Sequence, residues 1–105
     1  MQTIKEILAT AQENYTPMGI DKELVLIDDI KKLSVNDIKY NLLDFYSILQ
    51  LLYDSHGDDY VSVDGTNKDK IKQFILWLKE ISKEPSIDKD LVEDLIDIFS
   101  INVFY

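Results

Sequence analysis

The chain is a small acidic protein of 105 residues, with 46% hydrophobic and 30% charged positions. This length and balance predict one globular domain over residues 1–105 and exclude a disordered chain. Twenty acidic residues against eleven basic ones leave a net charge of −9, which argues against direct binding to nucleic acid or to an anionic membrane, because phosphate binding needs clustered cations.

The first two predicted elements are helices. Apolar residues spaced along one helical face predict a helix from Ile4 onward, with Thr3 as N-cap and Glu6 completing a capping box. The breakers in Thr16–Gly19 end it. From Asp21 to Leu33 the pattern fits a helix capped by Asp21 or a short buried strand over residues 24–27, and the spacing favours the helix.

A second capping-box pattern, Ser34-Val35-Asn36-Asp37, predicts that the longest helix runs from about Val35 to Asp54. This helix has apolar residues on nearly every side, Leu43 among them, and is therefore expected to be the most buried one. The run Ser55-His56-Gly57 is expected to end it. Alternation over Asp59–Asp64 then predicts a short extended segment.

Two further helices complete the predicted fold. Thr66 is expected to cap one that runs from about Asn67 to Lys83, and Ser86 or Asp88 to begin the last. The apolar tail, residues 101–105, is expected to pack into the core or to meet a partner. The predicted fold class is all-α, a compact bundle of four to five helices with a short extended segment near residues 59–64.

The residue types argue against catalysis. The chain has no cysteine, one histidine and no arginine, and it carries no Gly-rich phosphate loop or zinc-binding motif. His56 has no serine or cysteine partner nearby in the sequence. A calcium loop that began at Asp54 would place Asp59 where glycine is required. We therefore predict a protein that is not an enzyme and needs no cofactor or metal.

The charges are unevenly distributed along the chain. Residues 40–67 hold five acids and no lysine, residues 68–83 five lysines and two acids, and residues 84–105 six acids and one lysine. A lysine stripe on the fourth predicted helix (Lys68, Lys72, Lys79 and Lys83) fits a solvated face that partly neutralises the acids of a neighbouring helix.

Two acidic surfaces are candidates for partner binding. The first combines carboxylates with tyrosines, which are favoured in interfaces: Tyr53, Asp54, Asp58, Asp59, Tyr60 and Asp64. The second lies opposite the apolar face of the last helix: Asp90, Glu93, Asp94 and Asp97. Unmatched carboxylates steer a cationic partner. The alternative for the first surface is a solvated acidic loop between helices.

The stretch from Leu42 through His56-Gly57-Asp58-Asp59-Tyr60, with Ile71–Trp77 after it, resembles the colicin and pyocin immunity proteins. These are small acidic helical bacterial proteins that neutralise nuclease toxins. In that family, a long helix ends near a turn that contains histidine, and aspartates and tyrosines of the following element meet the toxin. The resemblance implies that Tyr53, Asp54, Asp58, Asp59 and Tyr60 contact a toxin.

Charge and resemblance together predict a non-enzymatic immunity or inhibitor protein. It would bind a basic protein, a toxin or a nuclease, and occlude its active or substrate-binding surface, because a nuclease must present cations to hold phosphate. With neither a signal segment nor the roughly 20 apolar residues that span a bilayer, a cytoplasmic monomer or homodimer is expected. The alternatives are a helical adaptor that acts through Trp77 and residues 103–105, and a phage-type nucleic-acid mimic.

Overall fold

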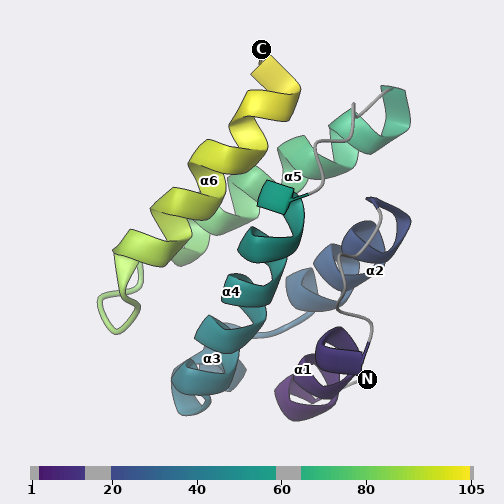
Figure 1. The fold of residues 1–105 in the computed structure, drawn as a ribbon. Helices are drawn as coiled ribbons and strands as arrows, with labels where there is room; N and C mark the ends of the chain where they lie inside the picture. Colours follow the sequence, from purple (N-terminus) through teal and green to yellow (C-terminus); the bar gives the residue numbers. More distant parts are fainter. Residues whose placement is uncertain (1–2, 14–19, 59–64, 105) are drawn as a thin grey trace.

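The computed structural model describes residues 3–13, 20–58 and 65–104. These residues form six α-helices and no strand (Figure 1): α1 (Ile4–Glu13), α2 (Ile20–Lys31), α3 (Val35–Tyr40), α4 (Leu42–Asp58), α5 (Gly65–Ile81) and α6 (Lys89–Phe104). The all-α prediction is confirmed, and the expected number of four to five helices is wrong. The extended segment expected over residues 59–64 lies outside the described residues.

The sixth helix arises because the single long helix expected from Val35 to Asp54 is two helices. Ser34 and Asp37 form the predicted capping box at its start. Asn41 then ends α3 with a non-helical backbone (φ −137°, ψ 42°), while its side-chain amide donates to the Asp37 carbonyl at 2.9 Å. Its own carbonyl accepts from the Phe45 amide at 2.9 Å and so begins α4. Asparagine favours such breaks because its amide competes with the backbone for hydrogen bonds.

Sequence signals locate the beginnings of α1, α2 and α6 closely. Glu6 donates its amide to the Thr3 hydroxyl at 3.2 Å, as the first capping box requires. Residues 21–31 are helical, which rules out the strand alternative there, and Asp21 lies in the first turn of α2, since that helix begins at Ile20. The Asp88 carboxylate accepts from the Asp90 amide at 3.0 Å next to the start of α6.

Three other predicted boundaries are wrong. Helix α4 continues through Ser55-His56-Gly57 to Asp58, so these residues do not stop it. Helix α5 begins at Gly65, which places Thr66 inside its first turn, and ends at Ile81, two residues before Lys83. Helix ends depend on tertiary packing and on competing turns more than on any one residue, so a breaker alone is a weak signal.

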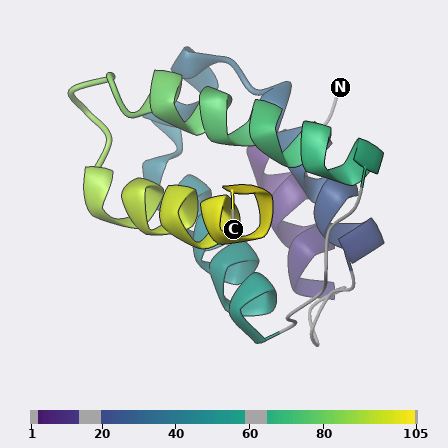
Figure 2. The ribbon, with the colours of Figure 1, turned by 90° about the horizontal axis from the view of Figure 1, so that it is seen from above.

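Five of the helices close a ring around the core. Helix α1 contacts α2 and α4, α4 contacts α6, α6 contacts α5, and α5 contacts α2, while α3 packs on α4. In Figure 1, α4 crosses the middle of the view, with α6 on its left and α1 and α2 on its right. Seen from above, α5 and α6 lie side by side (Figure 2). The buried side chains of all six helices form one hydrophobic cluster.

Aromatic residues join three of the helices at the centre of this cluster. The Phe74 ring meets the Phe99 ring edge to face, with centroids 5.6 Å apart, and stacks on Trp77 at 6.0 Å. Trp77 in turn lies 6.3 Å from Phe45, which is fully buried in α4. Trp77 is half-buried against the core. These contacts fix the rotation of α4, α5 and α6, and therefore decide which of their residues face outward.

Candidate functional site

The first predicted acidic surface lies at the C-terminal end of α4, and two of its six side chains are described. Tyr53 is half-buried against the core. Asp54, also half-buried, accepts a hydrogen bond from the Gln50 amide at 2.9 Å. Asp58 is the last residue of α4, and its side chain lies outside what the structure describes, as do Asp59, Tyr60 and Asp64. The structure therefore places Tyr53 and Asp54 on one helix and leaves the rest of this surface as a prediction.

The second predicted surface is fully described. The four carboxylates that we call the acidic face of α6 (Asp90, Glu93, Asp94 and Asp97) are all exposed, while Val92, Leu95 and Phe99 on the opposite side are fully buried. Within the described ranges, none of the four carboxylates forms an ion pair with a lysine. Helix α6 contains one lysine, Lys89, which is also exposed. The predicted acidic face is therefore a continuous, solvated row of negative charge.

The lysines of α5 do not neutralise this row by direct contact. Helices α5 and α6 pack against each other, yet in the described part of the chain no α5 lysine pairs with an α6 carboxylate. Lys68, Lys72 and Lys79 are exposed, and Lys83, two residues beyond the end of α5, pairs with Glu80 at 3.0 Å. The expected neutralisation between the two helices is thus limited to long-range attraction, which solvent and salt screen.

A third surface, not predicted from the sequence, lies at the junction of α3 and α4. Tyr40 and Leu43, which we call the Tyr–Leu patch, are 87% and 82% exposed. The expectation that apolar residues all round α4 would be buried is wrong for Leu43. At 100° per residue, Leu43 shares a face with Ser47, Gln50 and Asp54, and this polar spacing is the signal that could have placed it outside.

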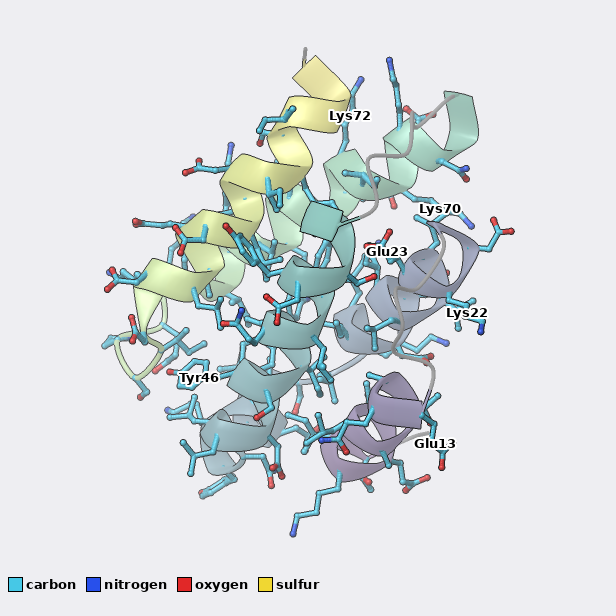
Figure 3. The ribbon with its side chains drawn as sticks, in the orientation of Figure 1. Glu13, Lys22, Glu23, Tyr46, Lys70 and Lys72 are labelled. Atoms are coloured by element: carbon cyan, nitrogen blue, oxygen red, sulfur yellow. The ribbon has the colours of Figure 1, made fainter. Side chains whose placement is uncertain are left out.

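The outward face of α4 adjoins the start of α6. Tyr46, three residues after Leu43, accepts a hydrogen bond on its hydroxyl from the Asp88 amide at 2.8 Å. Figure 3 shows Tyr46 reaching from α4 towards the connection that precedes α6. Tyr53 follows Tyr46 by seven residues and therefore lies on the same, α6-facing flank of α4. Tyr46 therefore connects the helix that carries Leu43 to the segment that directly precedes the acidic face of α6.

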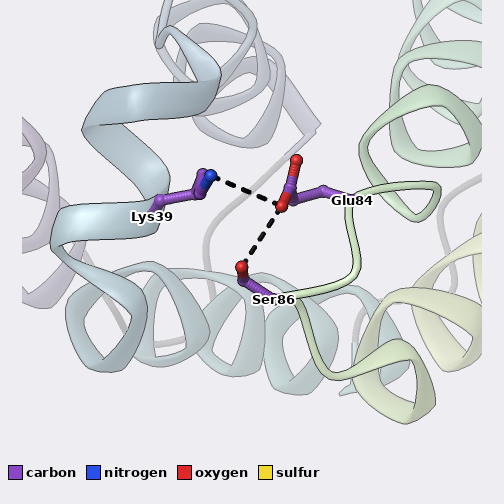
Figure 4. Close-up of polar contacts among 3 residues, drawn as sticks. All are labelled: Lys39, Glu84 and Ser86. Carbon is purple, nitrogen blue, oxygen red and sulfur yellow. Dashed lines mark hydrogen bonds and ion pairs between the residues drawn. The ribbon is translucent and has the colours of Figure 1, made fainter.

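An ion pair holds the same corner together from the side of α3. The Lys39 ammonium lies 3.6 Å from the Glu84 carboxylate, which also accepts from the Ser86 hydroxyl at 3.2 Å (Figure 4). Both partners of the ion pair keep some solvent contact, with side chains 41% and 23% exposed. Such a pair contributes little stability, on the order of 0–1 kcal/mol. Its consequence here is electrostatic, because Lys39, which directly precedes Tyr40 in the sequence, already has a carboxylate partner.

The buried polar side chains have a structural role. Glu23 in α2 and Ser55 in α4 are both fully buried, and each has a polar interaction. No buried side-chain nitrogen or oxygen atom in the described residues lacks a hydrogen-bond partner. Burying a carboxylate costs free energy unless it is paired, so satisfied groups of this kind help to specify one packing arrangement.

A pocket of about 210 Å³ lies between α1 and α2. Its walls are mostly apolar, with Ile7, Ala11, Val25 and Leu26, and its polar groups are Thr10, Lys22 and two carboxylates, Asp21 and Asp29. Across the described part of the chain, no three histidine, aspartate or glutamate side chains gather as metal ligands would. The pocket can hold a small apolar group.

Comparisons of the chain with protein-family models, with curated proteins and with solved structures find no match. Among the described helices, none combines the length and the apolar character needed to cross a bilayer. The chemistry of the described side chains is therefore what points to a function, and its most distinctive part is the exposed acidic face of α6.

Proposed function

We propose that this chain is a non-enzymatic acidic inhibitor, of the immunity-protein kind, that binds a basic protein and blocks its active or substrate-binding surface. The observation that supports the proposal is the acidic face of α6: four exposed carboxylates in one row, with no ion-pair partner among the described residues. Seven residues separate Asp90 from Asp97, roughly 10 Å of helix. Several like charges so close together destabilise the free protein slightly, and a cationic partner relieves that repulsion.

A nuclease is the class of partner that fits this charge best. A protein that cuts nucleic acid must hold phosphates with lysine or arginine, so its cleft is cationic. A row of carboxylates competes for those cations and speeds encounter through long-range attraction. At physiological salt the screening length is about 8 Å, so the row acts as one extended charge on a partner that comes near.

The proposed function is tested by asking whether the chain neutralises a toxic basic protein. The basic products of open reading frames next to this gene are expressed with and without the chain, and cell growth and nuclease activity are measured. We expect one product that is toxic alone and is neutralised by this chain in a stoichiometric complex. Loss of toxicity at substoichiometric amounts, with chemical change of the partner, would contradict a non-enzymatic inhibitor.

Two variants of equal net charge test whether the acidic face of α6 is the surface that binds the partner. The acidic-face variant is Asp90→Asn, Glu93→Gln, Asp94→Asn and Asp97→Asn. The control variant removes four acids from α1, α2 and α5, as Glu13→Gln, Asp21→Asn, Asp28→Asn and Asp69→Asn, so that both change the net charge from −9 to −5. We expect the first to lower the association rate about tenfold and to flatten its dependence on salt, and the control to do much less. Equal effects would show that only total charge matters.

A further inference from the structure

The Tyr–Leu patch is an exposed apolar surface that the fold does not use. Single apolar residues on a surface are common, but here two large side chains, three residues apart, are both more than four-fifths exposed. Tyrosine is enriched at the energetic centres of interfaces because it combines a large apolar body with a polar tip. Tyr40 directly precedes the break at Asn41, and Leu43 lies in the first turn of α4.

Carboxylates lie on the side of α4 that faces α6. Tyr46, three residues after Leu43, accepts from the Asp88 amide, and Asp90 begins the acidic face two residues later. The ammonium of Lys39, on the other side, is paired with Glu84. A segment that covers Leu43 and continues past Tyr46 towards α6 meets carboxylates after an apolar contact, which favours a segment whose apolar side chain has cationic neighbours.

Resting on the function proposed above, we infer that the Tyr–Leu patch anchors the same basic partner. An apolar or aromatic side chain of the partner packs on Leu43 and Tyr40, while its lysine or arginine neighbours lie against the acidic face of α6. The Tyr40 ring also offers its face to a cation. A second copy of this chain is the poorer occupant, because each copy carries a net charge of −9 and the two would repel.

The two parts of this surface have different kinetic roles. Exposed carboxylates act over a distance and mainly set the association rate. A contact on Leu43 removes apolar area from water only after docking, so it mainly sets the dissociation rate. The two contributions can therefore be measured separately.

Two synthetic peptides test the inference. One alternates lysine and arginine around a central tryptophan, and the other has serine in place of the tryptophan. The variant Leu43→Ser is compared with Leu76→Ser, a matched control on the lysine-bearing helix α5 whose leucine is 64% exposed. Both leucines face solvent, so neither change is expected to unfold the protein.

We expect the unmodified chain to bind the tryptophan peptide about tenfold more tightly than the serine peptide, which corresponds to partial burial of the anchor. Leu43→Ser should abolish this preference through faster dissociation, and Leu76→Ser should preserve it. The acidic-face variant should weaken binding of both peptides.

Failure of this inference can be distinguished from failure of the proposed function. A preference for tryptophan that survives Leu43→Ser would overturn the anchor, while weakened binding by the acidic-face variant would still support the proposed function. Unchanged binding of both peptides by the acidic-face variant would reject both proposals. Sedimentation provides the third measurement: a dimer that Leu43→Ser dissociates would assign the patch to a second copy of the chain and overturn the inference.

Discussion

The rotation of α4 decides which residues form the candidate surface, and the substitution Phe45→Ala tests it. Phe45 is fully buried and lies 6.3 Å from Trp77, centroid to centroid, across the boundary between α4 and α5. Tyr40, five residues earlier, is 87% exposed. The two aromatic residues are near neighbours in the sequence with opposite environments, so Tyr40→Ala is the matched control.

The expected cost follows from burial. Truncation of a buried phenylalanine to alanine costs about 3–5 kcal/mol, because the transfer free energy is lost and a cavity remains. The edge contact with Trp77 adds about 0.5–1.5 kcal/mol to what is lost. Native domains have a free energy of unfolding of about 5–15 kcal/mol, so this one change removes a large part of the total. Tyr40→Ala should cost less than about 0.5 kcal/mol, as exposed substitutions do.

Urea unfolding followed by far-UV circular dichroism measures both values. The midpoint should fall strongly for Phe45→Ala and hardly for Tyr40→Ala, with similar slopes if the transition stays two-state. A loss below about 1 kcal/mol at Phe45 would refute the assigned rotation of α4. An equal loss at Tyr40 would refute its exposed position at the end of α3. The Tyr–Leu patch would then lose its structural basis.

Two further predictions concern the same corner and the first acidic surface. Tyr46→Phe should cost about 0.5–1.5 kcal/mol in urea unfolding, because the Asp88 amide loses its acceptor, and an unchanged midpoint would show that the bond contributes nothing. His56→Ala should leave neutralisation of a toxic partner intact, since no catalytic role is proposed for it. If the purified protein turned over a substrate and His56→Ala abolished that turnover, the prediction of a non-enzymatic protein would be wrong.

The acidic surfaces and the hydrophobic core share the same helices. Helix α4 buries Phe45, Ile48, Leu49 and Leu52 while its outward face carries Leu43. Trp77, which the adaptor alternative would use as a contact, already stacks on Phe74 and meets Phe45, so much of its surface is occupied within the fold. Apolar contact with a partner is therefore better placed on the Tyr–Leu patch than on Trp77.

Local and periodic features could be predicted from the sequence. The Thr3–Glu6 and Ser34–Asp37 capping boxes form as predicted, because each needs only residues three apart. The acidic face of α6 was also predictable, since apolar residues at helical spacing determine the buried side and leave the carboxylates opposite. The all-α class was predictable from the helical spacing of apolar residues along most of the chain.

The tertiary structure decided the features that combine distant parts of the chain. The break at Asn41 has a local cause, yet an asparagine inside an apolar helical pattern does not by itself predict a new helix axis. The contact between Tyr46 and Asp88 joins residues 42 positions apart, and no local pattern predicts it. The rotation of α5 and α6 about their axes decides which carboxylates have no ion-pair partner within the described residues. The reason is that a lysine of α5 can face either α6 or the solvent.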